Sequence, residues 1–158
     1  MRSVRAGAPG VLPAAAAGLV VLAGCSEGVR VDATHPPVLA VQAASGAVEV
    51  EPWSWCYADP GGGACADGAP PADPPQLGAG TALPFEFVLD DWSFTATSEP
   101  VGTGCVVGRT VTAQGRRYEV DLAGVTGVHD VTVVGWGEQG DLSVTVRWDS
   151  GVPGDPTC

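Results

Sequence analysis

From Val38 onward, apolar and polar residues alternate in short runs, and this period of two predicts β-strands. Runs of this kind cover residues 38–43, 47–51, 53–57, 83–89, 92–96, 109–113, 116–122, 129–135 and 142–148. Short turn sequences separate the later runs at intervals of roughly ten residues. The pattern therefore predicts an all-β fold, an antiparallel β-sandwich of about 7–9 strands.

The first 24 residues follow a different pattern. Arg2 and Arg5 precede an apolar run over residues 11–22, which is shorter than the about 20 residues that a bilayer-spanning helix needs. The run has the length of a signal-peptide core and ends in Leu22-Ala23-Gly24-Cys25. This tetrapeptide resembles the lipobox of bacterial lipoproteins. In that class the cysteine receives a diacylglycerol, and a signal peptidase cuts before it.

The resemblance implies a signal peptide over residues 1–24 and a lipid anchor on Cys25 at the extracytoplasmic face of the cell membrane. The chain after the cut divides into a polar tether, 25–37, and one domain, 38–158. It would carry five basic residues against 18 acidic ones, a formal charge of −13. Such acidity argues against a nucleic-acid partner and leaves cationic ligands open.

Four cysteines remain once Cys25 is assigned to the lipid. An even number in an exported chain predicts two disulfides, and three pairings are possible. Cys56 and Cys65 bracket a turn-rich stretch, so we expect that pair to close locally and Cys105 to bond Cys158. Zinc is the alternative for four cysteines, but no Cys-x-x-Cys spacing is present.

Residues 59–80 interrupt the strand pattern because Gly and Pro dominate them and large apolar residues are nearly absent. We expect one long loop there, either functional or a solvated spacer. Asp59, Asp67 and Asp73 lie along it and are candidate binding residues for a cationic ligand or a metal ion. The spacing of these acids matches no EF-hand, so no metal site is assigned.

The segment 122–133 resembles the corner of bacterial immunoglobulin-like domains, in which a Leu and then Gly-x-Tyr-x-Val-x-Val enter a late core strand. This chain has Leu122 and Gly127 and then His129 in place of the tyrosine, followed by Val131 and Val133. The resemblance implies an immunoglobulin-like sandwich. We expect His129 to be a structural residue whose imidazole could donate the corner hydrogen bond.

No catalytic constellation is visible after the signal segment. No serine stands in Gly-x-Ser-x-Gly, and the two histidines are His35 in the tether and His129 among core valines. The absence of lysine excludes a phosphate-binding Gly-x-x-x-x-Gly-Lys loop. We therefore expect no cofactor and no enzyme activity, with a small extracytoplasmic hydrolase or a calcium-dependent enzyme as the alternative function.

Aromatic residues supply the last candidates. We expect Trp55, next to Cys56, to lie in the core. Trp136 stands between two glycines near a predicted hairpin turn at 138–141, where an exposed ring would suit stacking on a sugar or a protein. The alternative is a ring folded back over the sheet edge. The predicted function is a lipid-anchored binding or structural module whose partner, a protein, a carbohydrate or a cationic ligand, meets the long loop and the nearby hairpin tips.

Overall fold

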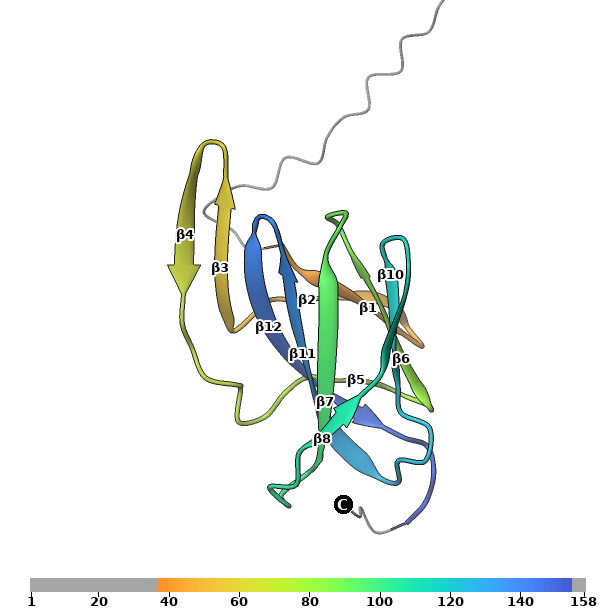
Figure 1. Ribbon diagram of the computed structural model, residues 1–158. Coiled ribbons are helices and arrows are strands. Elements are labelled where there is room, and N and C mark those ends of the chain that lie inside the picture. Colours follow the sequence, from red (N-terminus) through yellow and green to blue (C-terminus); the bar gives the residue numbers. More distant parts are fainter. Residues whose placement is uncertain (1–36, 155–158) are drawn as a thin grey trace, which may run out of the picture.

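A computed structural model describes residues 37–154 of the chain. It contains twelve strands and no helix within that range, so the described part is all-β as predicted. The strands form two sheets that face each other across one apolar core (Figure 1). No described helix is long and apolar enough to cross a membrane.

The first sheet has the order β2-β1-β6-β10-β9. Its strands are β1 (Leu39–Ala43), β2 (Gly46–Val50), β6 (Ala82–Phe87), β9 (Val111–Gln114) and β10 (Arg117–Asp121). The second sheet has the order β4-β3-β12-β11-β7-β8, and β5 pairs with β12 in addition. Its strands are β3 (Ser54–Asp59), β4 (Gly62–Ala66), β5 (Gln76–Ala79), β7 (Ser93–Pro100), β8 (Val107–Arg109), β11 (Val128–Gly137) and β12 (Gly140–Asp149).

This strand order is that of an immunoglobulin-like sandwich. Strands β1, β6, β10 and β9 take the places of A, B, E and D, while β12, β11, β7 and β8 take those of G, F, C and C′. The remaining strands, β2 to β5, are inserted between A and B. All pairings are antiparallel except that of β5, which runs parallel to β12.

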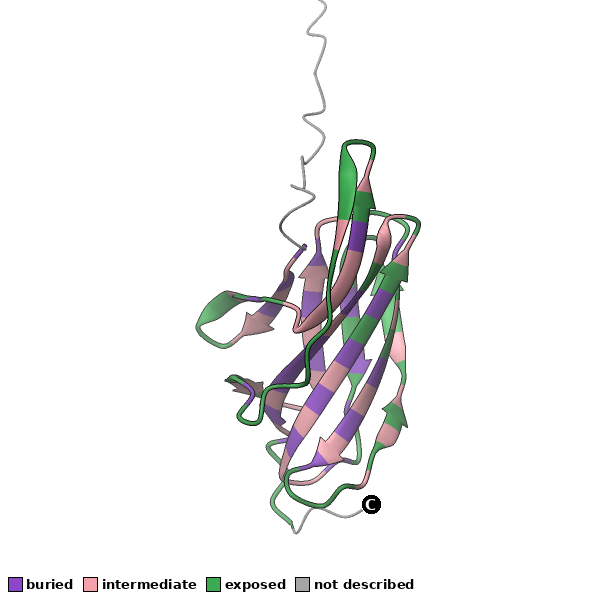
Figure 2. Ribbon diagram, turned by 90° about the vertical axis from the view of Figure 1, so that its left-hand side faces the viewer, coloured by how far each residue is buried: buried purple, intermediate pink, exposed green. Residues whose placement is uncertain are grey.

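Buried residues alternate with more exposed ones along the strands of both sheets (Figure 2), and the buried apolar residues form one core cluster. Tyr118 stacks on Phe85, with ring centroids 5.2 Å apart, and its hydroxyl donates a hydrogen bond of 3.1 Å to the carbonyl oxygen of Trp92. The buried tryptophans are Trp92 and Trp148. The prediction for Trp55 was only half right, because this ring packs against the core but stays partly exposed.

The prediction of one long loop at 59–80 was wrong. Residues 62–66 form β4, which pairs along its whole length with β3, and residues 76–79 form β5. Neither strand shows the alternation of a half-buried strand. The backbone ladder and the disulfide hold β4, whereas β5 fits beneath Trp148 because a Cβ on Gly78 would come within 2.6 Å of that ring.

The disulfide between Cys56 and Cys65 is confirmed. Cys105 is also disulfide-bonded. Its predicted partner, Cys158, lies outside the described residues, so the pairing itself stays a prediction. The lipobox-like tetrapeptide at 22–25 and the predicted tether residues before Pro37 lie outside them as well, so both stay predictions.

Candidate functional site

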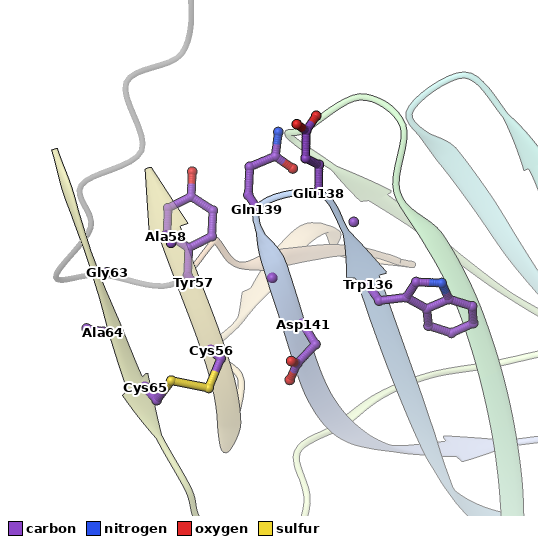
Figure 3. A pocket seen from close by; sticks show the side chains of 12 residues that line it. Cys56, Tyr57, Ala58, Gly63, Ala64, Cys65, Trp136, Glu138, Gln139 and Asp141 are labelled. Atoms are coloured by element: carbon purple, nitrogen blue, oxygen red, sulfur yellow. A yellow bond between two sulfur atoms is a disulfide. The ribbon is translucent and has the colours of Figure 1, made fainter. Parts of the chain in front are cut away.

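A row of four residues crosses the outer face of the second sheet. In the strand registers Cys65 faces Cys56, Cys56 faces Asp141, and Asp141 faces Trp136. Residues directly opposite each other point to the same side of a sheet. With about 4.8 Å between neighbouring strands, Asp141 therefore stands in the row between Trp136 and the disulfide. Its carboxylate points to the β3 side, whereas the indole of Trp136 extends to the other side, away from Asp141 (Figure 3).

The row forms part of an open groove with a volume of about 530 Å³. The groove is lined by the β3–β4 hairpin and by the end of the β11–β12 hairpin. Its lining residues are Cys56, Tyr57, Ala58, Gly63, Ala64, Cys65 and the segment Trp136 to Asp141. Trp136 is 45% exposed, so its indole is available to a ligand rather than folded into the core.

The two hairpins are held together by backbone and side-chain contacts. The amide of Ala58 donates a hydrogen bond of 2.8 Å to the carbonyl oxygen of Gln139 at the tip of the other hairpin. The side chain of Gln139 in turn accepts a hydrogen bond of 2.9 Å from the indole nitrogen of Trp92. Gly140 allows this approach, since a Cβ there would lie 1.9 Å from the carbonyl oxygen of Cys56. The groove is therefore built on fixed backbone.

The groove is acidic. Glu138 and Asp141 are exposed in it, and within residues 37–154 neither carboxylate forms an ion pair. The four described arginines bind elsewhere, to the partners Ser98 (Arg109), Asp90 (Arg116), Glu86 (Arg117), and Asp73 and Asp130 (Arg147). Burial, and secondarily the charge of Asp59, raises the pKa of Tyr57, so this groove residue stays neutral at physiological pH.

The three candidate aspartates of residues 59–80 lie in different settings. Asp59 lies at the tip of the β3–β4 hairpin, where Oδ1 accepts a hydrogen bond of 2.7 Å from the amide of Gly61. Asp67 follows β4 and its Oδ1 lies 3.5 Å from the hydroxyl of Ser54. Among the described residues no group of three or more His, Cys, Asp or Glu side chains is placed to hold a metal ion.

Asp73 has a structural role. Its Oδ1 lies 2.6 Å from Nη1 of Arg147, whose Nε binds Asp130 at 2.8 Å. The ion pair joins the segment before β5 to the face of the second sheet, and the amide of Arg147 donates to the carbonyl oxygen of Pro75 at 2.9 Å. Of the predicted candidates, only Trp136 lines the groove, with Asp59 at the nearby tip.

His129 occupies the corner position of the immunoglobulin-like fold, at the start of β11. It is 2% exposed, and its Nε2 lies 2.9 Å from the carbonyl oxygen of Thr126, three residues upstream. Because a carbonyl oxygen only accepts, Nε2 carries the proton and donates this hydrogen bond. The imidazole thus supplies the corner bond that a tyrosine hydroxyl supplies in related folds, and it is a structural residue.

The sequence argument missed Asp141 and Glu138 as groove residues because it treated 138–141 as one turn. The loop is tighter, since Gly137 pairs with Gly140 and only two residues join the strands. That register brings Asp141 opposite Trp136. The glycines on both sides of a two-residue connection were the available signal for it.

Comparisons with known proteins add little to this picture. No model of a known protein family matches the chain, and no curated protein does. A crystal structure of chicken CNTN1 FN1–FN3 domains overlaps 72% of this chain and 57% of its own, at 14% identity and a TM-score of 0.29. A likeness of this size supports no functional argument, so the fold assignment rests on the strand order described above.

Proposed function

We propose that this protein is a lipid-anchored, extracytoplasmic binding module whose outer-face groove takes a cationic side chain of a partner protein. The observation that carries the proposal is the register that sets Asp141 between Trp136 and the Cys56–Cys65 disulfide. A guanidinium or ammonium group can pair with this carboxylate, and a rotamer change of the exposed Trp136 would bring the face of the indole over the same cation.

The charges around the groove favour a cation over a sugar. Trp136 could stack on either, but Glu138 and Asp141 are groove carboxylates with no cation near them among the described residues. An indole contributes about 0.5–1 kcal/mol to binding an exposed cation, and an exposed ion pair about 0.2–1 kcal/mol. One such group binds weakly, so a stable complex requires further contacts around the groove.

The location rests on the sequence. The lipobox ending at Cys25 follows an apolar run too short to span a bilayer. A disulfide between Cys56 and Cys65 fits an oxidising, exported setting. The acidic chain would be repelled by an anionic bilayer, so the lipid on Cys25 would provide the attachment. No observation within residues 37–154 favours the alternative of a hydrolase or a calcium-dependent enzyme.

The binding proposal is tested with N-acetylarginine amide and its uncharged analogue, N-acetylcitrulline amide. Ligand-observed saturation-transfer NMR should detect the first and not the second. Asp141→Asn and Trp136→Ala should each weaken binding about two- to five-fold. Glu119→Gln is the matched control, because it removes one exposed carboxylate from the other sheet and should change nothing. Equal binding of the two ligands would refute the proposal.

The anchor is tested separately by cell fractionation. Cys25→Ser should block maturation or move the protein out of the membrane fraction. If the Cys25→Ser protein matures normally and still partitions with membranes through hydrophobic association, the lipid anchor is refuted while the groove remains open to its own test.

A further inference from the structure

The outermost strand of the second sheet, β4, is an unprotected edge. It ends the sheet order, pairs only with β3, and four of its five residues are exposed. Its sequence, Gly-Gly-Ala-Cys-Ala, contains none of the charges or prolines that usually block edge strands. The opposite edge, β8, has only three residues and includes Arg109, while edge strand β2 carries Glu49.

The register shows which backbone groups are available on β4. Cys56 and Cys65 face each other with Cα atoms 4.1 Å apart, the close spacing of a non-hydrogen-bonded antiparallel pair. Ala58, two residues along, turns its amide away from β4 and donates it to Gln139. The N–H and C=O groups of Cys65 and Gly63 therefore point outward from the sheet, at the alternate positions that an added strand requires.

The β3–β4 hairpin is both accessible and already ordered, which favours the addition of a partner strand to β4. It projects beyond the rest of the sandwich at one end of the molecule, so its outer edge is reachable (Figures 1 and 2). The Cys56–Cys65 disulfide links the two strands at the fourth of the five residues of β4. A strand that is already ordered loses little conformational freedom when a partner adds to it.

The charges at the two ends of β4 select the partner. Asp59 lies at the hairpin tip before β4, and Asp67 follows β4 directly. If β4 of a second copy of this chain paired with this edge, aspartates would face each other in both strand directions. Antiparallel pairing would place Asp59 near Asp67 of the other copy, and parallel pairing would place each aspartate near its own counterpart. An extended segment with basic residues at both ends meets opposite charge instead.

We propose that the edge of β4 binds an extended, basic-flanked peptide segment of a partner protein, which adds as a further strand to the second sheet. The backbone groups of Gly63 and Cys65 hold the segment, and Asp59 and Asp67 pair with its flanking lysines or arginines. This inference goes beyond the proposed cation-binding groove and stands without it, because the edge uses backbone groups and the groove uses Trp136 and Asp141.

The test uses the disulfide-bonded protein and a synthetic peptide of alternating Val and Thr between terminal Lys residues. The peptide is N-methylated along one edge, which leaves its other edge able to pair. On binding, the amides of Gly63 and Cys65 should shift in saturable fashion and exchange more slowly with solvent. A peptide N-methylated along both edges should leave the Gly63 and Cys65 amides unchanged, even if its lysines reach the groove. If both peptides shift and protect these two amides equally, docking on β4 is through side chains and the proposal is overturned.

Protein variants test the charges. Replacing Asp59 and Asp67 together by Asn, which keeps the turn hydrogen bonds, should weaken peptide binding about two- to ten-fold. Glu119→Gln, which removes an exposed carboxylate from the other sheet, should leave binding unchanged. Self-association through β4 without peptide binding, seen by sedimentation and by slowed exchange at Gly63, would overturn the proposal, as would the absence of any saturable response.

Discussion

Trp136 and Asp141 lie directly opposite each other in the β11–β12 hairpin, one residue pair before its connection. Both side chains point to the outer face of the sheet. Five sequence positions separate an aromatic ring from a carboxylate, and the two-residue connection brings them together. The strand on the other side of Asp141 adds the disulfide. The most distinctive chemistry of the described surface thus arises from one register, which any change in the hairpin connection would alter.

Gly140 fixes that register. Gly140→Ala would place a Cβ 1.9 Å from the carbonyl oxygen of Cys56, at a backbone φ of +144° that L side chains rarely adopt. We expect a loss of more than about 3 kcal/mol in the free energy of unfolding, because the backbone of β3 must move away. Urea denaturation measures it.

Gly124→Ala is the matched control. Gly124 also has a positive φ, +79°, but no atom lies within 4 Å of the added Cβ. Gly124→Ala should lower the free energy of unfolding by only about 1–2 kcal/mol, which is the cost of a left-handed backbone conformation for an L residue. Equal losses in the two variants would contradict the close packing of the hairpins.

Sequence reasoning recovered the strands whose side chains divide between core and solvent. In β12, Leu142, Val144, Val146 and Trp148 are buried while their neighbours face outward, so the period of two was visible. It could not recover β4, whose five small residues carry no pattern and whose order comes from backbone pairing and one disulfide. Twelve strands were therefore found in residues 37–154, where about 7–9 were expected.

The candidate site was recovered only in part for a related reason. An exposed Trp136 could be anticipated from the glycines around it, and its carboxylate partner could not without the register. Asp73 looked like a free acid in a loop, yet its partner Arg147 is 74 positions away in the sequence. A contact between residues so far apart in the sequence depends on the complete fold, and the local sequence around Asp73 gives no indication of it.

Tyr118 provides a test of the core and of its pH dependence. Tyr118→Phe removes the hydrogen bond to Trp92 and should lower the free energy of unfolding by about 1 kcal/mol at neutral pH. Burial, followed by the charges of Asp90 and Asp91, raises the pKa of Tyr118. Its contribution is therefore full below the unfolded tyrosine pKa of about 10 and is lost as pH rises through the higher folded pKa.

The free energy of unfolding measured above pH of about 10 tests whether Tyr118 loses its contribution as pH rises. Wild-type stability should fall as pH rises above about 10, and Tyr118→Phe should make the fall shallower, with the remainder coming from Tyr57. Thermal unfolding monitored by near-ultraviolet circular dichroism gives both curves. A steeper alkaline fall in Tyr118→Phe would show that the burial of this hydroxyl was assigned wrongly.

The Asp73–Arg147 ion pair should control local rather than global order. Asp73→Asn removes the charge while Arg147 keeps Asp130, so the melting temperature should change little. Amide exchange at Arg147, which donates to Pro75, should become about two- to five-fold faster. Glu86→Gln, which breaks the exposed pair with Arg117 on the other sheet, is the control and should leave that amide unchanged.

The most direct measurement of the central claim is the indole N–H resonance of Trp136 during titration with N-acetylarginine amide. The account predicts a saturable shift of this resonance and of the Asp141 amide, with the same midpoint for both and with the indole resonance of buried Trp148, which donates to Gly80, unmoved. Asp141→Asn should displace the midpoint to about two- to five-fold higher ligand. An unsaturable drift, or an equal shift with N-acetylcitrulline amide, would contradict a cation site between Trp136 and the disulfide.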